Sequence, residues 1–95
     1  MTTEQFFLEA RYTRQKSFYN KAVVTRENDG SLRLYSYGTW VATIYPDVYY
    51  LLHRHAAYSN TTVRHVNEFL MQFTRIDENL SIGRIRELID KPQKI

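Results

Sequence analysis

The spacing of apolar residues changes once along the chain, close to Tyr58. From Ser17 to about His53, apolar and polar side chains alternate at every second position, which is typical of β-strands. From Thr61 to Phe73, apolar residues recur at intervals of three and four, which is typical of a helix with one buried face. This order predicts an α+β fold, in which a small antiparallel meander of four to five strands packs against one main C-terminal helix.

Turn signals divide the alternating region into strands. Glycine and proline suit the backbone angles of tight turns, and they mark turns at Asp29-Gly30, Gly38-Thr39 and Pro46-Asp47. The segments between these turns are rich in aromatic and β-branched residues. Strands are therefore predicted at 17–26, 32–37, 40–45 and 48–53.

Alternation also assigns side chains to the two faces of the predicted sheet. In the segment 40–45, it puts Trp40 on the same face as Ala42 and Ile44, with Val41 on the other face. One face is expected to meet the helix, which leaves the opposite face free to contact something else.

The two ends of the chain carry weaker patterns. Residues 6–12 alternate and favour a strand, although Thr2 to Gln5 also resembles the first turn of a helix. Near the other end, a short helix is predicted over 82–89, capped by Ser81 and ended by Pro92.

The main helix is predicted to bury one apolar stripe and to expose its other positions. Asn60, or Thr61 beside it, is expected to cap the first turn. The stripe consists of Val63, Val66, Phe69, Leu70 and Phe73, and the exposed positions include Arg64, Asn67, Glu68 and Gln72. Burial of large apolar side chains at about 1.5–3 kcal/mol each makes this stripe the largest stabilising contact in the sequence.

Length and composition indicate one domain over residues 1–95, with a β-rich part at 5–55 and a helical part at 60–91. The sequence has no cysteine, which excludes disulfides and thiolate zinc sites and suits a reducing cytoplasm. The polar start resembles no secretory signal, and no apolar run approaches the roughly 20 residues that span a bilayer. A cytoplasmic protein without a membrane partner is expected.

No pattern in the sequence indicates a catalytic or metal centre. The acidic residues are scattered, and neither a phosphate-binding glycine loop nor a nucleophile elbow is present. His53 and His55 would face one side of an extended chain and His65 lies on the helix, but zinc needs three or four ligands in tight geometry. We expect surface or half-buried histidines, and a protein that is not an enzyme and uses no cofactor or metal.

The best candidate for a binding surface is a basic stretch rich in aromatic residues. The net charge is +3, and every charged residue between Ala10 and Glu27 is basic. Cations contact phosphates while aromatic rings stack on bases, although a charged strand edge is the alternative reading. Arg64 is added because a cation near a helix N-terminus opposes the helix dipole. The predicted binding residues are Arg11, Tyr12, Arg14, Lys16, Tyr19, Lys21, Arg26 and Arg64.

Three segments in order, at 16–22, 34–42 and 58–70, carry the patterns SFYxKA, LYSYxTxVA and YSxTTxRHxxEFL. Together they resemble an uncharacterised family of small proteins carried by phages, plasmids and integrative elements of Gram-positive bacteria. Gly38 stands where that family often has asparagine, and either residue suits a positive-φ turn. The resemblance implies an intracellular accessory protein of a mobile element and transfers no catalytic residue.

Three functional hypotheses follow. The first is a non-enzymatic accessory protein that binds a host protein or nucleoprotein, for example a CRISPR effector as an anti-CRISPR inhibitor of a nuclease defence system. The second is a small regulatory protein that binds RNA or DNA through the stretch 11–26. The third is a structural homodimer joined through a sheet edge or through the segment 82–89.

Overall fold

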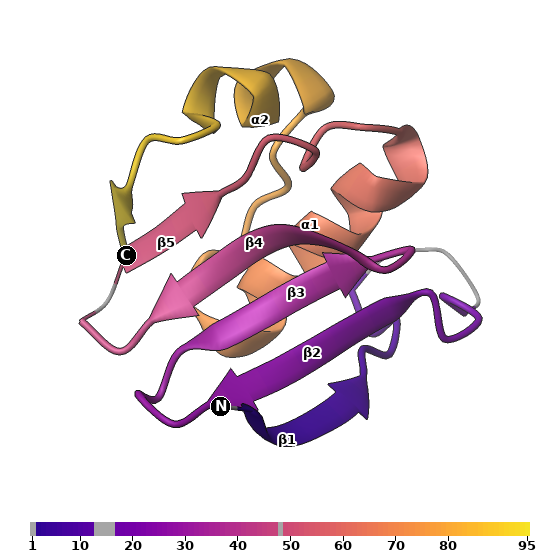
Figure 1. Cartoon of the computed structure of the whole chain (residues 1–95). Helices are drawn as coiled ribbons and strands as arrows, with labels where there is room; N and C mark the ends of the chain where they lie inside the picture. The colour runs from indigo at the N-terminus through magenta and orange to yellow at the C-terminus, as the bar shows by residue number, and fades with distance from the viewer. Residues whose placement is uncertain (1, 13–16, 48) are drawn as a thin grey trace.

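The computed structural model describes residues 2–12, 17–47 and 49–95 (Figure 1). Six strands form one sheet in the order β1 to β6, and each strand runs antiparallel to its neighbours. The elements are β1 (Thr2–Phe7), β2 (Ala22–Glu27), β3 (Leu32–Ser36), β4 (Thr39–Tyr45), β5 (Tyr49–Leu52), α1 (Asn60–Phe73), α2 (Ile82–Leu88) and β6 (Gln93–Lys94). This confirms the predicted α+β fold. In this described part of the chain, neither helix has the length and apolarity needed to cross a membrane.

The molecule has two layers, because α1 lies behind the sheet and no other element of the described residues covers the near face of the sheet (Figure 1). The register of the strands assigns each side chain to one of these faces. The covered face, against α1, comprises Phe6, Ala22, Val24, Leu32, Leu34, Ala42, Ile44, Tyr50 and Leu52. The open face comprises Gln5, Phe7, Val23, Thr25, Glu27, Arg33, Tyr35, Trp40, Thr43, Tyr45, Tyr49, Leu51, His53 and Lys94.

The predicted apolar stripe of α1 is confirmed. Val66, Phe69 and Leu70 are almost completely buried, Val63 is buried, and Phe73 packs at the margin of the core. Each fully buried side chain of this size contributes roughly 1.5–3 kcal/mol relative to an exposed one. The stripe is therefore the main contact between the two layers.

The prediction that Asn67 and Glu68 face solvent is wrong, since both are buried. Asn67 donates to the carbonyl of Leu80 (2.9 Å) and accepts from the Leu80 N–H (2.7 Å), so it fastens the segment before α2. Glu68 accepts the backbone N–H of Tyr12 at 2.8 Å, which fastens the segment after β1. Apolar periodicity does not predict such residues, because it identifies buried positions by their apolar side chains. Backbone groups that pack against the helix need polar partners, and those partners are then buried as well.

The N-cap of α1 is Ser59, one residue before the predicted Asn60 or Thr61. Ser59 has an extended backbone (φ −151°), and its Oγ accepts the N–H of Thr62 at 3.1 Å. Several adjacent residues in this segment are good caps by type, so the residue type alone does not select one. The backbone conformation at Ser59 makes the selection.

The predicted strand at 17–26 begins later than expected, at Ala22. Tyr19 (φ 50°) and Asn20 (φ 63°) adopt left-handed conformations, and the N–H of Lys21 donates to the carbonyl of Phe18 at 2.9 Å. This turn buries Phe18 in the core. The apolar pattern of the sequence continues through this turn, because Phe18 is buried there although it does not belong to a strand.

An irregularity in β4 changes the predicted faces of that strand. The register shifts after the pair Leu34–Ala42, so that Tyr35 opposes Trp40 and Val41 is the extra residue. Trp40 is thereby turned to the open face, while Val41 is buried. The prediction that Trp40 shares a face with Ala42 is wrong, because one inserted residue inverts the alternation beyond it.

The ends of the chain complete the sheet. β1 confirms that the first segment is a strand, although it lies at Thr2–Phe7 rather than at 6–12. The helix α2 has its predicted N-cap, with Ser81 Oγ accepting the N–H of Arg84 at 3.1 Å, and it ends at Leu88. The strand β6 pairs with β5 and was not predicted, because two residues are too few to show alternation.

Candidate functional site

The centre of the open face is a cluster around Trp40, the single tryptophan of the chain. The guanidinium carbon of Arg33 lies 4.4 Å from the centre of the Trp40 ring, and the His53 ring centre lies 4.4 Å from it. The indole N–H donates to Thr43 Oγ1 at 2.9 Å, and Thr43 Oγ1 lies 2.7 Å from His53 Nε2. Three strands or their extensions thus hold Trp40 against the sheet.

The charges of this cluster are set by its packing. Burial lowers the pKa of His53, and the positive charge of Arg33 lowers it further against the opposing effect of Asp90. A neutral His53 suits the hydrogen bond with Thr43. A hydrogen bond to Tyr35 raises the pKa of Arg33, and the negative charge of Glu27 adds to this. Glu27 itself is buried and accepts from Thr25 Oγ1 at 2.7 Å, so it presents little charge to solvent.

The rest of the open face is unusually apolar for a surface without a second layer. Phe7 is 53% exposed, Tyr49 is 42% exposed and Trp40 is 37% exposed. Partly buried apolar and aromatic side chains lie between them, namely Val23, Tyr35, Tyr45 and Leu51. The Nε of Arg33 is buried and has no hydrogen-bond partner among the described residues.

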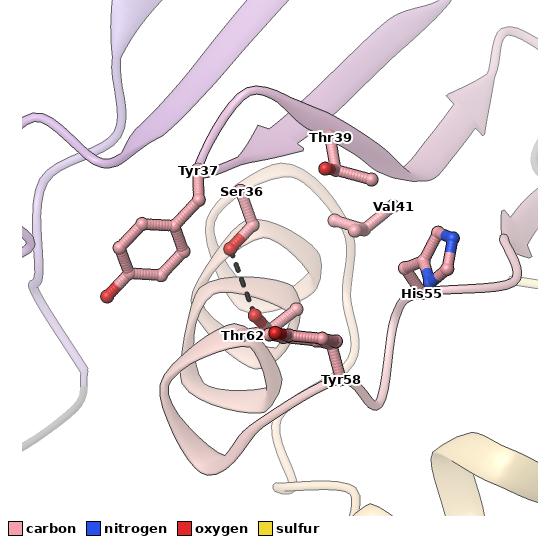
Figure 2. Close-up of a pocket in the computed structure, with 7 residues that line it drawn as sticks. All are labelled: Ser36, Tyr37, Thr39, Val41, His55, Tyr58 and Thr62. Carbon is pink, nitrogen blue, oxygen red and sulfur yellow. Dashed lines mark hydrogen bonds between the residues drawn. The ribbon is translucent and has the colours of Figure 1, made fainter.

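A second candidate is a cleft at the end of the two layers, with a volume of about 330 Å³. It lies where the β3–β4 turn, the segment before α1 and the first turn of α1 meet. Figure 2 shows Ser36 and Thr62 facing each other, with His55 at the opposite side from Tyr37. The cleft is lined by Ser36, Tyr37, Thr39, Val41, His55, Tyr58 and Thr62.

A polar network lies directly behind this cleft. Ser36 Oγ is 2.8 Å from His65 Nδ1 and 3.2 Å from Thr62 Oγ1. His65 is fully buried, beside the ring of Phe18 at 4.5 Å between centres. Burial lowers the pKa of His65 to about 4. His65 is therefore neutral near pH 7, and the expectation of a surface or half-buried histidine is wrong for this residue.

The Ser36–His65 pair has the residue types of a nucleophile and its base, but its geometry does not favour that chemistry. The Nε2 of His65 has no hydrogen-bond partner within the described residues, so no acid orients the ring. A histidine with a pKa of about 4 is also a weak base for a serine hydroxyl. The pair is better explained as a buried anchor between β3 and α1.

The three histidines lie in different surroundings. His53 joins the open face, His55 lines the cleft, and His65 is buried behind it. The expectation that His53 and His55 face one side does not hold, because the chain leaves β5 after Leu52. Over the described residues, no group of three or more His, Cys, Asp or Glu side chains is arranged to hold a metal ion.

The predicted basic stretch is distributed over several parts of the molecule. Arg11 and Tyr12 are exposed beside the second half of α1, where Tyr12 is held by Glu68. Tyr19 and Lys21 lie before β2, and the Lys21 carbonyl accepts a hydrogen bond from the backbone N–H of Tyr37 at 2.8 Å. Arg14 and Lys16 lie outside the described residues.

The remaining two predicted residues lie elsewhere. Arg26 is near the other end of β2, and its Nε is 3.6 Å from Glu4 Oε1. Five residues of strand at ~3.3 Å each put Lys21 and Arg26 roughly 16 Å apart. Arg64 is exposed on α1. The described members therefore do not converge on one site, and their role in binding stays a prediction.

The open-face cluster was missed by sequence reasoning, although a signal for it exists. A sheet with one solvated face normally shows polar residues at the alternate positions. Here the open-face positions 23, 35, 45, 49 and 51 are Val, Tyr, Tyr, Tyr and Leu. Apolar residues at these alternate positions are the signal in the sequence that distinguishes this face from an ordinary solvated one.

Comparison with known proteins places the chain in a family. No curated protein and no solved structure matches it. One family model, described as a family of unknown function (DUF8033), matches residues 6–84, which include the open-face cluster and the whole cleft. This match covers most of the sequence, and the chain therefore belongs to that family.

Proposed function

We propose that the protein is a non-enzymatic binding protein that docks a host protein, alone or within a nucleoprotein, on the open face of its sheet. The observation that carries this proposal is the row that Phe7, Val23, Tyr35 and Trp40 form across four strands of the open face. Phe7 and Trp40 are exposed in this row, Arg33 lies over the Trp40 ring, and the exposed Tyr49 lies toward the other end of the same face. Contiguous apolar patches of this kind mark interaction sites on soluble proteins. Tryptophan, tyrosine and arginine are also the residues that contribute most binding energy at protein interfaces.

The charge of the open face favours a protein over a nucleic acid as the direct contact. Arg33 and Lys94 are the basic side chains that the strand register puts on this face. A polyanion is bound by several cations that displace its counterions together. The second hypothesis, binding of RNA or DNA through 11–26, is less well supported because its described cations are spread over the molecule and Arg26 is close to Glu4.

The resemblance of the sequence to proteins of phages, plasmids and integrative elements supports a biological setting for this proposal. An accessory protein of a mobile element acts in the host cytoplasm, where host defence systems are its natural targets. An inhibitor that occupies a surface needs no catalytic group. The concrete version of the proposal is an anti-CRISPR protein that blocks a CRISPR effector.

Affinity capture with variants of exposed aromatic residues tests the docking surface. The double variant Phe7→Ser/Tyr49→Ala removes exposed rings from the open face, whereas Tyr58→Ala removes an exposed ring elsewhere. A host protein captured by the wild type and by Tyr58→Ala, but at least tenfold less by the double variant, is the expected result. A partner retained equally by all three proteins, or no partner at all, would overturn the proposal.

A plasmid-interference assay tests the anti-CRISPR version separately. Co-expression of the wild-type protein with the CRISPR effector of its host is expected to restore transformation by a targeted plasmid. The Phe7→Ser/Tyr49→Ala variant is expected to lose this effect. If the captured partner is not a defence nuclease and CRISPR interference persists in the presence of the wild-type protein, the docking proposal stands and the anti-CRISPR version is excluded.

A further inference from the structure

We propose that the cleft between the β3–β4 turn and the start of α1 is a binding site for a single nucleobase, presented by a nucleoside or a nucleotide. This site is separate from the open face, because its lining lies between the two layers and at the end of the sheet. The proposal therefore does not depend on the docking function.

The size of the cleft suits one small ligand. Its volume of about 330 Å³ is at the lower end of the range of small-molecule sites, which is roughly 300–1,000 Å³. Val41 gives it an apolar wall, and the ring of Tyr58 lies beside Thr62 at the opposite wall (Figure 2). A flat ring fits between two such walls, and tyrosine is a common stacking partner for bases.

The polar groups of the lining match a base better than an aromatic side chain. Hydroxyl groups both donate and accept, and the lining holds those of Thr39 and Tyr58, together with the imidazole of His55. The hydroxyl of Thr62 is already bonded to Ser36 and Ser59. A nucleobase carries donors and acceptors along the edge of its ring, whereas an indole or phenol carries a single polar group. The lining therefore offers more hydrogen bonds than an aromatic amino acid uses.

The charge of the lining narrows the ligand further. No carboxylate and no lysine or arginine lines the cleft as described. A cationic ligand would lose water there without gaining a counter-charge, which is unfavourable. The uncharged lining therefore suits a ligand with a neutral ring best.

Two features hold the cleft in shape without a ligand. Ser36 is buried and anchored to His65 at 2.8 Å and to Thr62 at 3.2 Å, so the inner wall is rigid. At the rim, Tyr37 adopts a left-handed conformation (φ 52°), which is uncommon for a bulky residue. The neighbouring Gly38 (φ 81°) completes the tight turn. Positive φ at both residues is the geometry of a two-residue hairpin turn, so the β3–β4 connection fixes the rim of the cleft in place.

Titration with nucleosides, followed by amide chemical shifts, tests this proposal directly. Adenosine, guanosine, cytidine and uridine, and their 5′-monophosphates, are added to the full-length protein. At least one base is expected to bind with a Kd in roughly the submillimolar range, as suits a ligand of this size. The shifts are expected at 36–39, at 41 and at 55–62, and not at open-face residues remote from the cleft, such as Arg33, Thr43 and Tyr49.

Two variants locate the binding. Tyr58→Ala removes a ring that is 79% exposed, and Thr39→Trp fills the cleft from an exposed position, so both are expected to fold. Each is expected to weaken binding at least tenfold. The matched control is Tyr49→Ala, which removes an exposed tyrosine from the open face and is expected to bind as the wild type does.

The remaining outcomes are also decisive. Tighter binding of a monophosphate than of its nucleoside, still lost in Tyr58→Ala, supports the cleft and identifies a nucleotide as the ligand. Competition by inorganic phosphate alone would show anion binding rather than base recognition and overturn the proposal. The absence of shifts with every base, or binding that survives Thr39→Trp, overturns it as well. None of these results bears on capture of a partner by the open face.

Discussion

Both faces of the sheet carry large apolar and aromatic side chains, but their surroundings differ. The covered face is sealed by α1, whose residues Val66 and Phe69 have no exposed surface. The open face carries Tyr35, Tyr45 and Tyr49 from three strands, with no element of the described chain over them. The protein therefore folds on one face and leaves the other available.

The open face differs from an exposed core because its central aromatic residue has polar partners within the sheet. Trp40 is held by Arg33 and His53, and its N–H is paired with Thr43. Polar partners within the layer keep the aromatic side chains ordered in contact with water. An ordered aromatic surface loses less side-chain entropy on binding than a flexible one.

The largest expected effect comes from truncating one large side chain on each side of the comparison. Phe69→Ala, on the covered side, is expected to lower the free energy of unfolding by about 3–5 kcal/mol, because it leaves a cavity in the core. Tyr49→Ala, on the open face, is expected to change it by only about 0.5 kcal/mol. Urea denaturation measures both. Similar losses for the two variants would show that the open face also acts as a core.

The next effect concerns His65, which links the covered face to α1. Its pKa is lowered to about 4 by burial, from an ordinary 6.5. The unfolded chain therefore binds a proton more readily than the folded protein, and stability falls as the pH drops from about 6.5 and levels off below about 4. The loss attributable to this residue is roughly 3 kcal/mol.

Unfolding curves at pH 7 and pH 4 measure this dependence against a matched variant. His65→Gln removes the titrating group. Its free energy of unfolding is therefore expected to fall by roughly 3 kcal/mol less than that of the wild type between pH 7 and pH 4. The control His55→Gln replaces an exposed histidine that lines the cleft and leaves His65 in place, so it shows what a histidine substitution outside the core does. An unchanged pH dependence in His65→Gln would contradict the assigned burial.

A smaller effect tests how α1 is held over the covered face. Asn67→Ala removes both hydrogen bonds to the backbone of Leu80 and is expected to cost about 1–3 kcal/mol. Asn67→Asp keeps the acceptor for the Leu80 N–H, but it puts a buried carboxylate oxygen against the Leu80 carbonyl and is expected to cost at least as much near neutral pH. Arg64→Ala, on the exposed side of the same helix, serves as the control. Equal stability of Asn67→Ala and Arg64→Ala in thermal unfolding would exclude a structural role for Asn67.

The smallest effect identifies the cap of α1. Ser59→Ala is expected to cost about 1 kcal/mol, because the N–H of Thr62 loses its acceptor. Asn60→Ala is expected to change stability by only a few tenths of a kcal/mol, since Asn60 is already inside the helix. Chemical denaturation of both variants decides between the two positions. A larger loss for Asn60→Ala would restore the cap expected from the sequence.

Periodicity alone was sufficient for the elements that bury a regular stripe. The pattern from Val63 to Phe73 predicted α1, and Asp29-Gly30 predicted a turn in which Gly30 has a φ of 88°. Such features depend on local backbone preference and on apolar spacing, which are both properties of neighbouring residues. The same local reasoning could not identify Ser59 among several good caps or begin the predicted strand after Tyr19-Asn20.

The candidate sites depend on contacts between distant segments. Trp40 meets Arg33 and His53 only after the irregularity in β4 turns it to the open face. Ser36 and His65 are 29 residues apart in sequence and meet when α1 packs on the sheet. The sequence by itself determined the fold class and the apolar stripe, because spacing and turn chemistry act locally. The tertiary structure alone decided which aromatic residues stay exposed and which polar residues are buried, because strand register and helix packing bring distant residues together.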